Sequence, residues 1–309
     1  MPRLQLRQRR TRQVRQARER LLRHSAHLAQ ALDVACQTLR EGFHGDRLAR
    51  FRHTVTNVDE PSVRSHALFM NTKHAKRTFL ITGASQGLGL ALSETFARDG
   101  ASVVMVARSR ERLIQEAHRL RNEGLDVHAF AFDVSAKGDA YRIAGAAELA
   151  VGPIDVLVHN ASALGPTPLR PLGLGECEDF EDVLETNVVG PFRLTKALLP
   201  SLTRPGARSP ALVFISSDAA SEAYPSWGFY GASKAAADHL ARTFAAEHAG
   251  LRVVSFDPGE MDTAMHQAAI PDADRAILAH PLDVARALAL RLESVSSGTR
   301  VVLQGGHHA

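Results

Sequence analysis

A glycine-rich turn between a short apolar strand and a helix constrains the fold of this chain more than any other feature. Phe79–Ile81 is predicted to be a buried strand, Thr82–Gly89 has the sequence Thr-Gly-Ala-Ser-Gln-Gly-Leu-Gly, and a helical pattern continues to Asp99-Gly100. Glycines let the backbone approach a pyrophosphate, and the helix N-terminus offers N–H groups to an anion. The turn alone is a weak signal, but its strand and helix context indicate a dinucleotide-binding unit.

Strands and helices alternate along the chain after this turn. A strand followed by a crossover helix and another strand is typical of a parallel sheet. The pattern predicts an α/β fold, a doubly wound Rossmann-type parallel sheet of about seven strands with helices on both faces. Further strands are predicted at Ser102–Val106, Val127–Phe132, Ile154–Val158, Ala211–Ile215 and Arg300–Leu303.

The charge of the chain divides it into two parts. Residues 1–69 contain fourteen Arg, no Lys and six acidic residues, a net charge of +8, whereas the remainder has a net charge of −4. A chain of 309 residues with 45% hydrophobic residues suits one large globular domain plus an appendage. We therefore predict an Arg-rich extension, helical or disordered, at 1–69 and a catalytic domain at 70–309, whose own charge gives no reason to expect nucleic acid.

Three interpretations of the Arg-rich extension stay open. It could bind RNA or an anionic membrane surface, act as a targeting or oligomerisation arm, or be an upstream segment that is not part of the natural product. Apolar residues recur at helical spacing from Leu21 to Leu39, which makes a helix plausible there. We favour the third interpretation because Met70-Asn71-Thr72-Lys73 resembles a natural start just before the first strand.

Cysteine content and hydropathy favour a cytoplasmic location. Cys36 and Cys177 are too few for a disulfide framework and lack metal-ligand spacing. No apolar run is long enough to cross a bilayer, and the Met1 end lacks the apolar stretch of a secretory signal. His307 and His308 are interpreted as a polar tail, so no metal site is predicted.

Tyr230 and Lys234 form a candidate acid–base pair. Residues four apart on a helix lie on the same face, and a cation beside a phenol favours the phenolate. Tyr230 could then exchange a proton with a carbonyl or an alcohol. Tyr224 has only Gly228 four residues on. The pair by itself is also what an ordinary helix surface would show.

The end of the second strand predicts which cofactor is bound. An acid at this position usually reads a free ribose 2′-hydroxyl, whereas an Arg accommodates a 2′-phosphate. Ala107 stands where the acid would be expected, and Arg108 follows it, with Ser109 as a second donor. We therefore expect NADP(H) to be preferred, with NAD(H) possible. The alternative is that Arg108 only begins a charged helix.

Several motifs occur in one order and at compatible spacings. Together they resemble the short-chain dehydrogenase/reductase family over about Thr78 to Gly306. Besides the glycine turn, they are Asp133-Val134, His159-Asn160-Ala161-Ser162, Thr186-Asn187-Val188-Val189-Gly190, Tyr230 with Lys234, and Pro258-Gly259-Glu260-Met261-Asp262-Thr263.

The resemblance implies an NADP-dependent oxidoreductase that interconverts a carbonyl and an alcohol on a small organic substrate. Ser217, thirteen residues before Tyr230, would polarise the substrate oxygen, and successive strand side chains face opposite ways, which separates it from Ser216. Tyr230 would move the proton, Lys234 would lower the Tyr pKa and hold the nicotinamide ribose, and Asn187 would hold a water. The implied cofactor-binding residues are Gly83, Ser85, Gln86, Gly87, Leu88, Gly89, Arg108, Ser109, Asp133, Val134, Asn160, Ala161, Tyr230, Lys234, Pro258, Gly259, Met261 and Thr263.

The chain departs from the family pattern near the site. His159 and Ser162 replace an Asn and a Gly, and Ala220 stands where a Gly often follows the catalytic Ser, so we expect altered packing there. His159 is interpreted as a buried structural histidine. Trp227 and Phe229 could contact a substrate or belong to the core.

The substrate itself is not predicted. The family's variable lid would lie at Ala264–His280, where it is short, and Met265, His266, Ile270 and Pro271 could line the pocket. The resemblance also implies a homodimer or a homotetramer. The rival hypothesis is a non-catalytic dinucleotide-binding regulator, which would need only the cofactor cleft and not the set of Ser, Tyr, Lys and Asn.

Overall fold

The computed structural model describes residues 77–303. The predicted Arg-rich extension, Gly305-Gly306 and the two terminal histidines lie outside the described residues. Seven strands form the sheet: β1 Thr78–Thr82, β2 Ser102–Ala107, β3 Val127–Ala131, β4 Val156–His159, β5 Ala211–Ile215, β6 Arg252–Asp257 and β7 Arg300–Val302.

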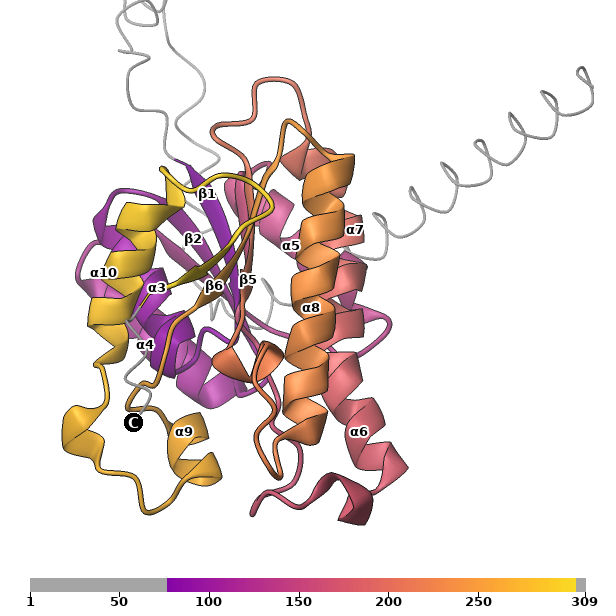
Figure 1. The fold of residues 1–309 in the computed structure, drawn as a ribbon. Helices are drawn as coiled ribbons and strands as arrows, with labels where there is room; N and C mark the ends of the chain where they lie inside the picture. The colour runs from indigo at the N-terminus through magenta and orange to yellow at the C-terminus, as the bar shows by residue number, and fades with distance from the viewer. Residues whose placement is uncertain (1–76, 304–309) are drawn as a thin grey trace, which may run out of the picture. The chain divides into compact units, whose positions relative to one another are not determined.

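All neighbouring strands of the sheet are parallel, in the order β3-β2-β1-β4-β5-β6-β7. Figure 1 labels β1, β2, β5 and β6 of this sheet. The predicted doubly wound Rossmann sheet is thus confirmed. The strand order reverses direction between β1 and β4, and ligands of such sheets bind outside the carboxyl ends of the strands at this switch point.

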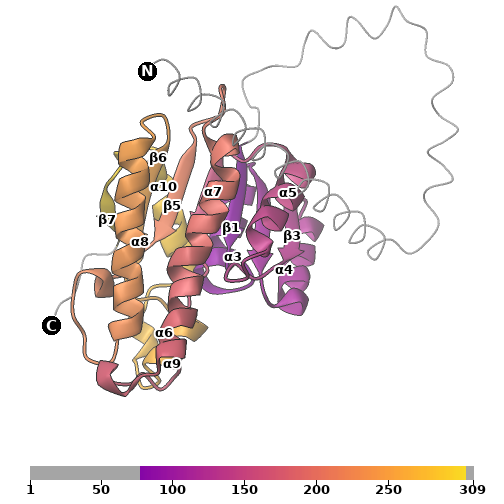
Figure 2. The same ribbon diagram turned by 90° about the vertical axis from the view of Figure 1, so that its right-hand side faces the viewer.

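Helices cover both faces of the sheet. One face packs against α3 (Gly87–Arg98), α4 (Arg110–Asn122) and α10 (Pro281–Leu292). The other packs against α5 (Asp139–Val151), α7 (Gly190–Leu202) and α8 (Gly228–Glu247), and Figure 2 shows α7 and α8 side by side on this face. Because both faces are covered, the central strands β1, β4 and β5 are buried along their whole length.

Shorter elements gather beyond the carboxyl ends of the strands. Both views show α6 (Cys177–Leu184) and α9 (Ala264–Ala269) at the same end of the domain (Figures 1 and 2). A π-helix, Glu185–Val189, joins α6 to α7, and 3₁₀ turns occupy Leu172–Leu174, Asp218–Ala220 and Arg275–Ile277.

Two predicted boundaries were wrong by a few residues. The segment Asp218–Phe229 between the predicted strand and Tyr230 was interpreted as a loop, but it contains a 3₁₀ turn at Asp218–Ala220, and α8 already begins at Gly228. The strand predicted from Ile154 begins at Val156, since Asp155 uses its carboxylate to accept from the Thr78 backbone N–H. Among residues 77–303, no helix is long and apolar enough to cross a membrane.

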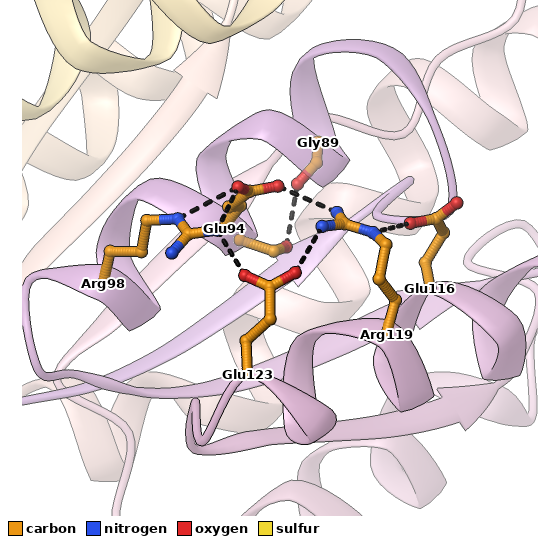
Figure 3. Close-up of polar contacts among 7 residues, drawn as sticks. Gly89, Glu94, Arg98, Glu116, Arg119 and Glu123 are labelled. Atoms are coloured by element: carbon orange, nitrogen blue, oxygen red, sulfur yellow. Dashed lines mark hydrogen bonds and ion pairs between the residues drawn. The ribbon is translucent and has the colours of Figure 1, made fainter.

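An ion-pair cluster joins α3 to α4 on the surface. The Glu94 carboxylate accepts from Arg98 Nη2 at 2.7 Å and from Arg119 Nη2 at 2.8 Å. Glu116 and Glu123 complete this α3–α4 cluster through Arg119 and Arg98 (Figure 3). The contacts fix two neighbouring helices of the cofactor half of the domain.

Candidate active site

A cleft of about 1370 Å³ opens at the carboxyl edge of the sheet. It brings together the predicted catalytic residues Ser217, Tyr230 and Lys234 with nearly all the predicted cofactor-binding residues. Gly89 and Asn187 are the two predicted site residues that do not line it. Both lie next to residues that line it, Gly89 beside Gly83 and Asn187 beside Ser162.

The glycine turn is built so that its backbone can lie close to neighbouring chain. Gly83 has a φ of +67°, and a Cβ there would come within 2.8 Å of Asn160 Nδ2. A Cβ at Gly89 would lie only 2.3 Å from the Gly83 carbonyl oxygen. Asn160 Nδ2 in turn donates to the Thr82 carbonyl at 2.9 Å. No side chain fits at either glycine, so the cradle presents backbone at the N-terminus of α3, as a phosphate site requires.

The end of β2 has the features predicted for reading a ribose phosphate. Arg108 and Ser109 are exposed and line the cleft, and Ala107 beside them offers no carboxylate. Arg112 of α4 contacts the Gln86 side chain of the glycine turn, and no pattern in the sequence predicts this contact. Asp133 lines the same end and uses Oδ1 to accept from the Ser135 N–H at 2.9 Å.

Tyr230 is buried in the wall of the cleft, in the first turn of α8. Burial raises the pKa of its phenol well above the usual value, and hydrogen bonds with the Ser217 and Ser162 hydroxyls oppose that rise. The Trp227 ring stands edge-on to the Tyr230 ring, with 5.7 Å between centroids. The phenol is therefore held protonated, in contact with two hydroxyls, where a substrate oxygen could reach it.

Lys234 lies beside Tyr230, but its ammonium donates to a backbone carbonyl and not to the Tyr230 hydroxyl. Its Nζ donates to the Ile215 carbonyl at 2.8 Å and lies 5.4 Å from the centre of the Tyr230 ring. Burial lowers the pKa of Lys234 to about 8, and Asp238 and Asp257 act in the opposite direction. The groups that lower the Tyr230 pKa are hydroxyls; the lowering by Lys234 stays a prediction.

Asn187 lies in the π-helix, a feature that often marks a functional position. Its Oδ1 accepts from the Ala163 N–H at 2.8 Å and from Ser162 Oγ at 3.1 Å. Its Nδ2 donates to the Ala163 carbonyl and to Ser233 Oγ, both at 2.8 Å. The amide is saturated by protein groups, so the predicted water would have to bind the backbone carbonyl of this residue instead.

The structure separates several competing candidates. Ser217 contacts Tyr230, whereas Ser216 Oγ donates to the buried Asp238 carboxylate at 2.8 Å. Tyr224 donates to Asp218 at 3.0 Å, and this hydrogen bond raises its pKa. Among Ser216, Ser217, Tyr224 and Tyr230, the serine and the tyrosine that form a hydrogen bond with each other are Ser217 and Tyr230.

Two further interpretations concern residues near the site. His159 is buried, and its Nε2 lies 2.7 Å from Thr195 Oγ1. Burial lowers its pKa to about 3, which fits a neutral structural histidine. Phe229 stacks on Phe180 of α6 at 4.9 Å and does not line the cleft, so it belongs to the packing, whereas Trp227 does line it.

The lid predicted after Thr263 contains α9 and a 3₁₀ turn. Met265, His266 and Ile270 line the cleft, whereas Pro271 does not. Asp262 anchors the segment, because it accepts two hydrogen bonds from Arg275, each of 2.9 Å. One wall of the substrate end is thus held by a bidentate ion pair.

Several site residues were missed from the sequence. Ser162, noted only as a departure from a glycine, contacts both Tyr230 and Asn187. Two buried carboxylates, Asp238 and Asp257, pair with the partly buried Arg300 and act on the charge of Lys234. Sequence position could have indicated the two aspartates, because Asp238 follows Lys234 by one helical turn and Asp257 directly precedes the Pro258-Gly259 motif.

Comparisons with known proteins agree with this architecture. Residues 77–274 match the family model described as short chain dehydrogenase. The uncharacterized oxidoreductase YciK of Escherichia coli K12 is 34% identical over 212 residues, which are 67% of this chain and 82% of that protein.

Two solved structures have the same fold. A short chain dehydrogenase from Shigella flexneri 2a, complexed with NADP, has 31% identity and a TM-score of 0.68 over 74% of this chain and 97% of its own. An alcohol dehydrogenase from Thermococcus sibiricus, complexed with 5-hydroxy-NADP, has 29% identity and a TM-score of 0.68 over 76% and 100%.

Proposed function

Because the chain belongs to the short-chain dehydrogenase family of oxidoreductases, we propose that it interconverts a carbonyl and an alcohol on a small organic substrate, with NADP(H) as its preferred cofactor. The observation that carries the proposal is the contact between Tyr230 and Ser217 in the wall of a cleft that begins at the glycine turn. A regulator that only binds a dinucleotide has no need of that contact.

The cleft suits a phosphorylated dinucleotide. The side-chain-free backbone at Gly83 and Gly89 would hold the pyrophosphate at the N-terminus of α3. Arg108 and Ser109 would bind the ribose 2′-phosphate, and the complexes of the Shigella and Thermococcus proteins support this cofactor. When bound, a nicotinamide cofactor supplies or accepts the hydride. The remaining predicted cofactor-binding residues would line the part of the cleft that holds the rest of the cofactor, as far as Thr263.

The side chains of this chain would handle the proton and the orientation. Ser217 would donate to the substrate oxygen, and Tyr230 would give that oxygen a proton in reduction or remove it in oxidation. The raised Tyr230 pKa suits a proton donor in the reductive direction. Lys234 would hold the nicotinamide ribose and stabilise the phenolate left after proton transfer.

The decisive test is Tyr230→Phe in a screen of ketones, aldehydes and acyl thioesters with NADPH. We expect turnover to fall by a factor of about 10²–10⁴, the usual contribution of a general acid, while NADPH binding measured by fluorescence is retained. Tyr141→Phe on α5 makes the same chemical change outside the cleft and should keep full activity. Undiminished turnover in Tyr230→Phe would refute the assignment.

Cofactor preference is tested separately at Arg108. The ratio of kcat/KM for NADPH to that for NADH should fall by about tenfold or more in Arg108→Ala, because a charge-assisted contact to a phosphate is lost. Arg110→Ala, two residues on at the start of α4 and not lining the cleft, is the matched control. If both variants discriminate like the parent, Arg108 does not read the phosphate.

A further inference from the structure

Two buried carboxylates and a partly buried arginine lie near Lys234, and none of them was predicted to have a role in the site. Asp238 lies one turn further along α8, Asp257 ends β6, and Arg300 begins β7. We propose that Asp238, Asp257 and Arg300 are positioning residues of the oxidoreductase site, which keep Lys234 protonated and hold the Ser217 segment in place. The inference rests on the proposed function, because it assigns these residues a role through Lys234 and Ser217.

Arg300 connects the motifs of the site from the neighbouring strand. Its Nη2 donates to the Ser217 carbonyl and to Asp257 Oδ2, both at 2.8 Å. Asp257 Oδ1 accepts in turn from the Gly259 N–H at 3.0 Å. The Arg300 guanidinium therefore links the Ser217 backbone, through Asp257, to the Pro258-Gly259 turn. A displacement of β7 would displace the Ser217 segment and this turn together.

Asp238 provides the second carboxylate of the set. Its Oδ2 accepts from Ser216 Oγ at 2.8 Å and lies 3.3 Å from Arg300 Nε. Its other oxygen is buried and has no hydrogen-bond partner within the described residues. The cation that contacts this carboxylate is Arg300, and Lys234 lies one helical turn before it on α8.

The two carboxylates and two cations balance one another. Lys234, Asp238 and Asp257 are all at most 5% exposed, so their mutual interactions are weakly screened by solvent. Burial alone would drive Lys234 to its neutral form, and the two carboxylates oppose this. Burial likewise raises the pKa of Asp257, and Arg300 lowers it. The other titratable groups facing the set are Tyr230 on α8 and Asp218 on the 3₁₀ turn, and neither adds a cation.

A purely structural role makes a different prediction. Asp155, directly before β4, is a buried carboxylate that is 1% exposed. It also pairs with an arginine, Arg204. It lies outside the cleft. If Asp238 only satisfies the core, Asp238→Asn and Asp155→Asn should lower stability in the same way and leave Lys234 unaffected in both.

The test follows the protonation of Lys234 directly. The intact protein is acylated with trace acetic anhydride over a range of pH, and labelling of the Lys234 peptide is measured by mass spectrometry. In Asp238→Asn we expect the labelling curve to move toward acid by about one pH unit, the low end for loss of a nearby opposite charge. Labelling at neutral pH should then rise by up to about tenfold. Asp155→Asn, folded to the same extent by thermal unfolding, should label like the parent.

Activity gives a second readout that separates failure of this inference from failure of the proposed function. The alkaline limb of the kcat profile should shift with the labelling curve. Arg300→Gln should lower kcat with little change in the KM for NADPH, Arg300→Lys should recover part of the loss, and Arg252→Gln on the neighbouring strand should match the parent. An unshifted Lys234 curve in folded Asp238→Asn overturns the inference. If the parent reduces no carbonyl substrate, the proposed function fails, and the labelling curve still decides whether these residues control Lys234.

Discussion

The molecule contains two groups of arginines and acids that differ mainly in their contact with water. In the α3–α4 cluster, the side chains of Arg98 and Arg119 are 49% and 42% exposed. In the set around Lys234, both carboxylates are buried and Arg300 is largely covered. The contact lengths are similar, so any difference in their effects must come from the surroundings.

The surroundings decide what each group can do. Exposed ion pairs are screened and contribute about 0–1 kcal/mol each, whereas removing one partner of a buried pair costs about 3–5 kcal/mol. The surface cluster therefore steadies two helices. The buried set controls the charge of a residue in the proposed site, because charges in a poorly hydrated environment shift the protonation of their neighbours.

Asp257→Ala should produce the largest effect on stability. It removes a buried carboxylate that pairs with Arg300, leaving Arg300 its longer ion pair with Asp238, and it removes the acceptor of the Gly259 N–H. We expect the free energy of unfolding, measured in urea, to fall by about 3–5 kcal/mol. A loss below about 1 kcal/mol would mean that the buried set is as well screened as the surface cluster, and the comparison would fail.

The pH dependence of Lys234 should give the next largest effect. Its folded pKa of about 8 lies below the ordinary lysine value of 10.5, so above pH 8 the unfolded state binds more protons than the folded state. The stability of the parent relative to Lys234→Met should therefore rise between about pH 8 and pH 10, by about 2–3 kcal/mol in total. Urea unfolding of both proteins at several pH values measures the difference. A flat or falling difference would show that burial does not depress this pKa.

Most of the fold followed from the sequence because local patterns and burial agreed. The central strands are continuous apolar runs, so β5 was predicted with its observed bounds, Ala211–Ile215. The π-helix at Glu185–Val189 carries no such signal, since its residues fit an α-helical pattern equally well. The start of α8 at Gly228 was missed because glycine is a poor helix former and was assigned to a loop.

The site was predicted in its motifs but not in its supporting contacts. Tyr230, Lys234 and Ser217 have fixed spacings, and the structure brings all three to one cleft. Arg300 lies 83 residues after Ser217, and only the pairing of β6 with β7 brings it near. Contacts of this kind depend on strand order and on burial, which no local pattern encodes.

Glu94→Gln on the surface cluster should produce the smallest effect. Burial raises the pKa of Glu94, but hydrogen bonds from Arg119 and Arg98 outweigh it and lower the pKa overall. Its contribution is therefore present above the ordinary glutamate pKa of 4.5 and is lost as the pH falls through the lower folded pKa. At neutral pH we expect Glu94→Gln to lower the free energy of unfolding by about 1 kcal/mol or less, and the loss should shrink in high salt.

The matched control for this surface change is Glu148→Gln on α5, because no ion pair within residues 77–303 involves Glu148. Urea unfolding of parent and variants at low and high salt measures both differences. The salt dependence matters more than the size of the loss, because screening acts on exposed charges and hardly on buried ones. If Glu94→Gln cost several kcal/mol regardless of salt, the α3–α4 cluster would behave like a buried pair, and exposure would no longer explain why one group of charges steadies helices while the other controls Lys234.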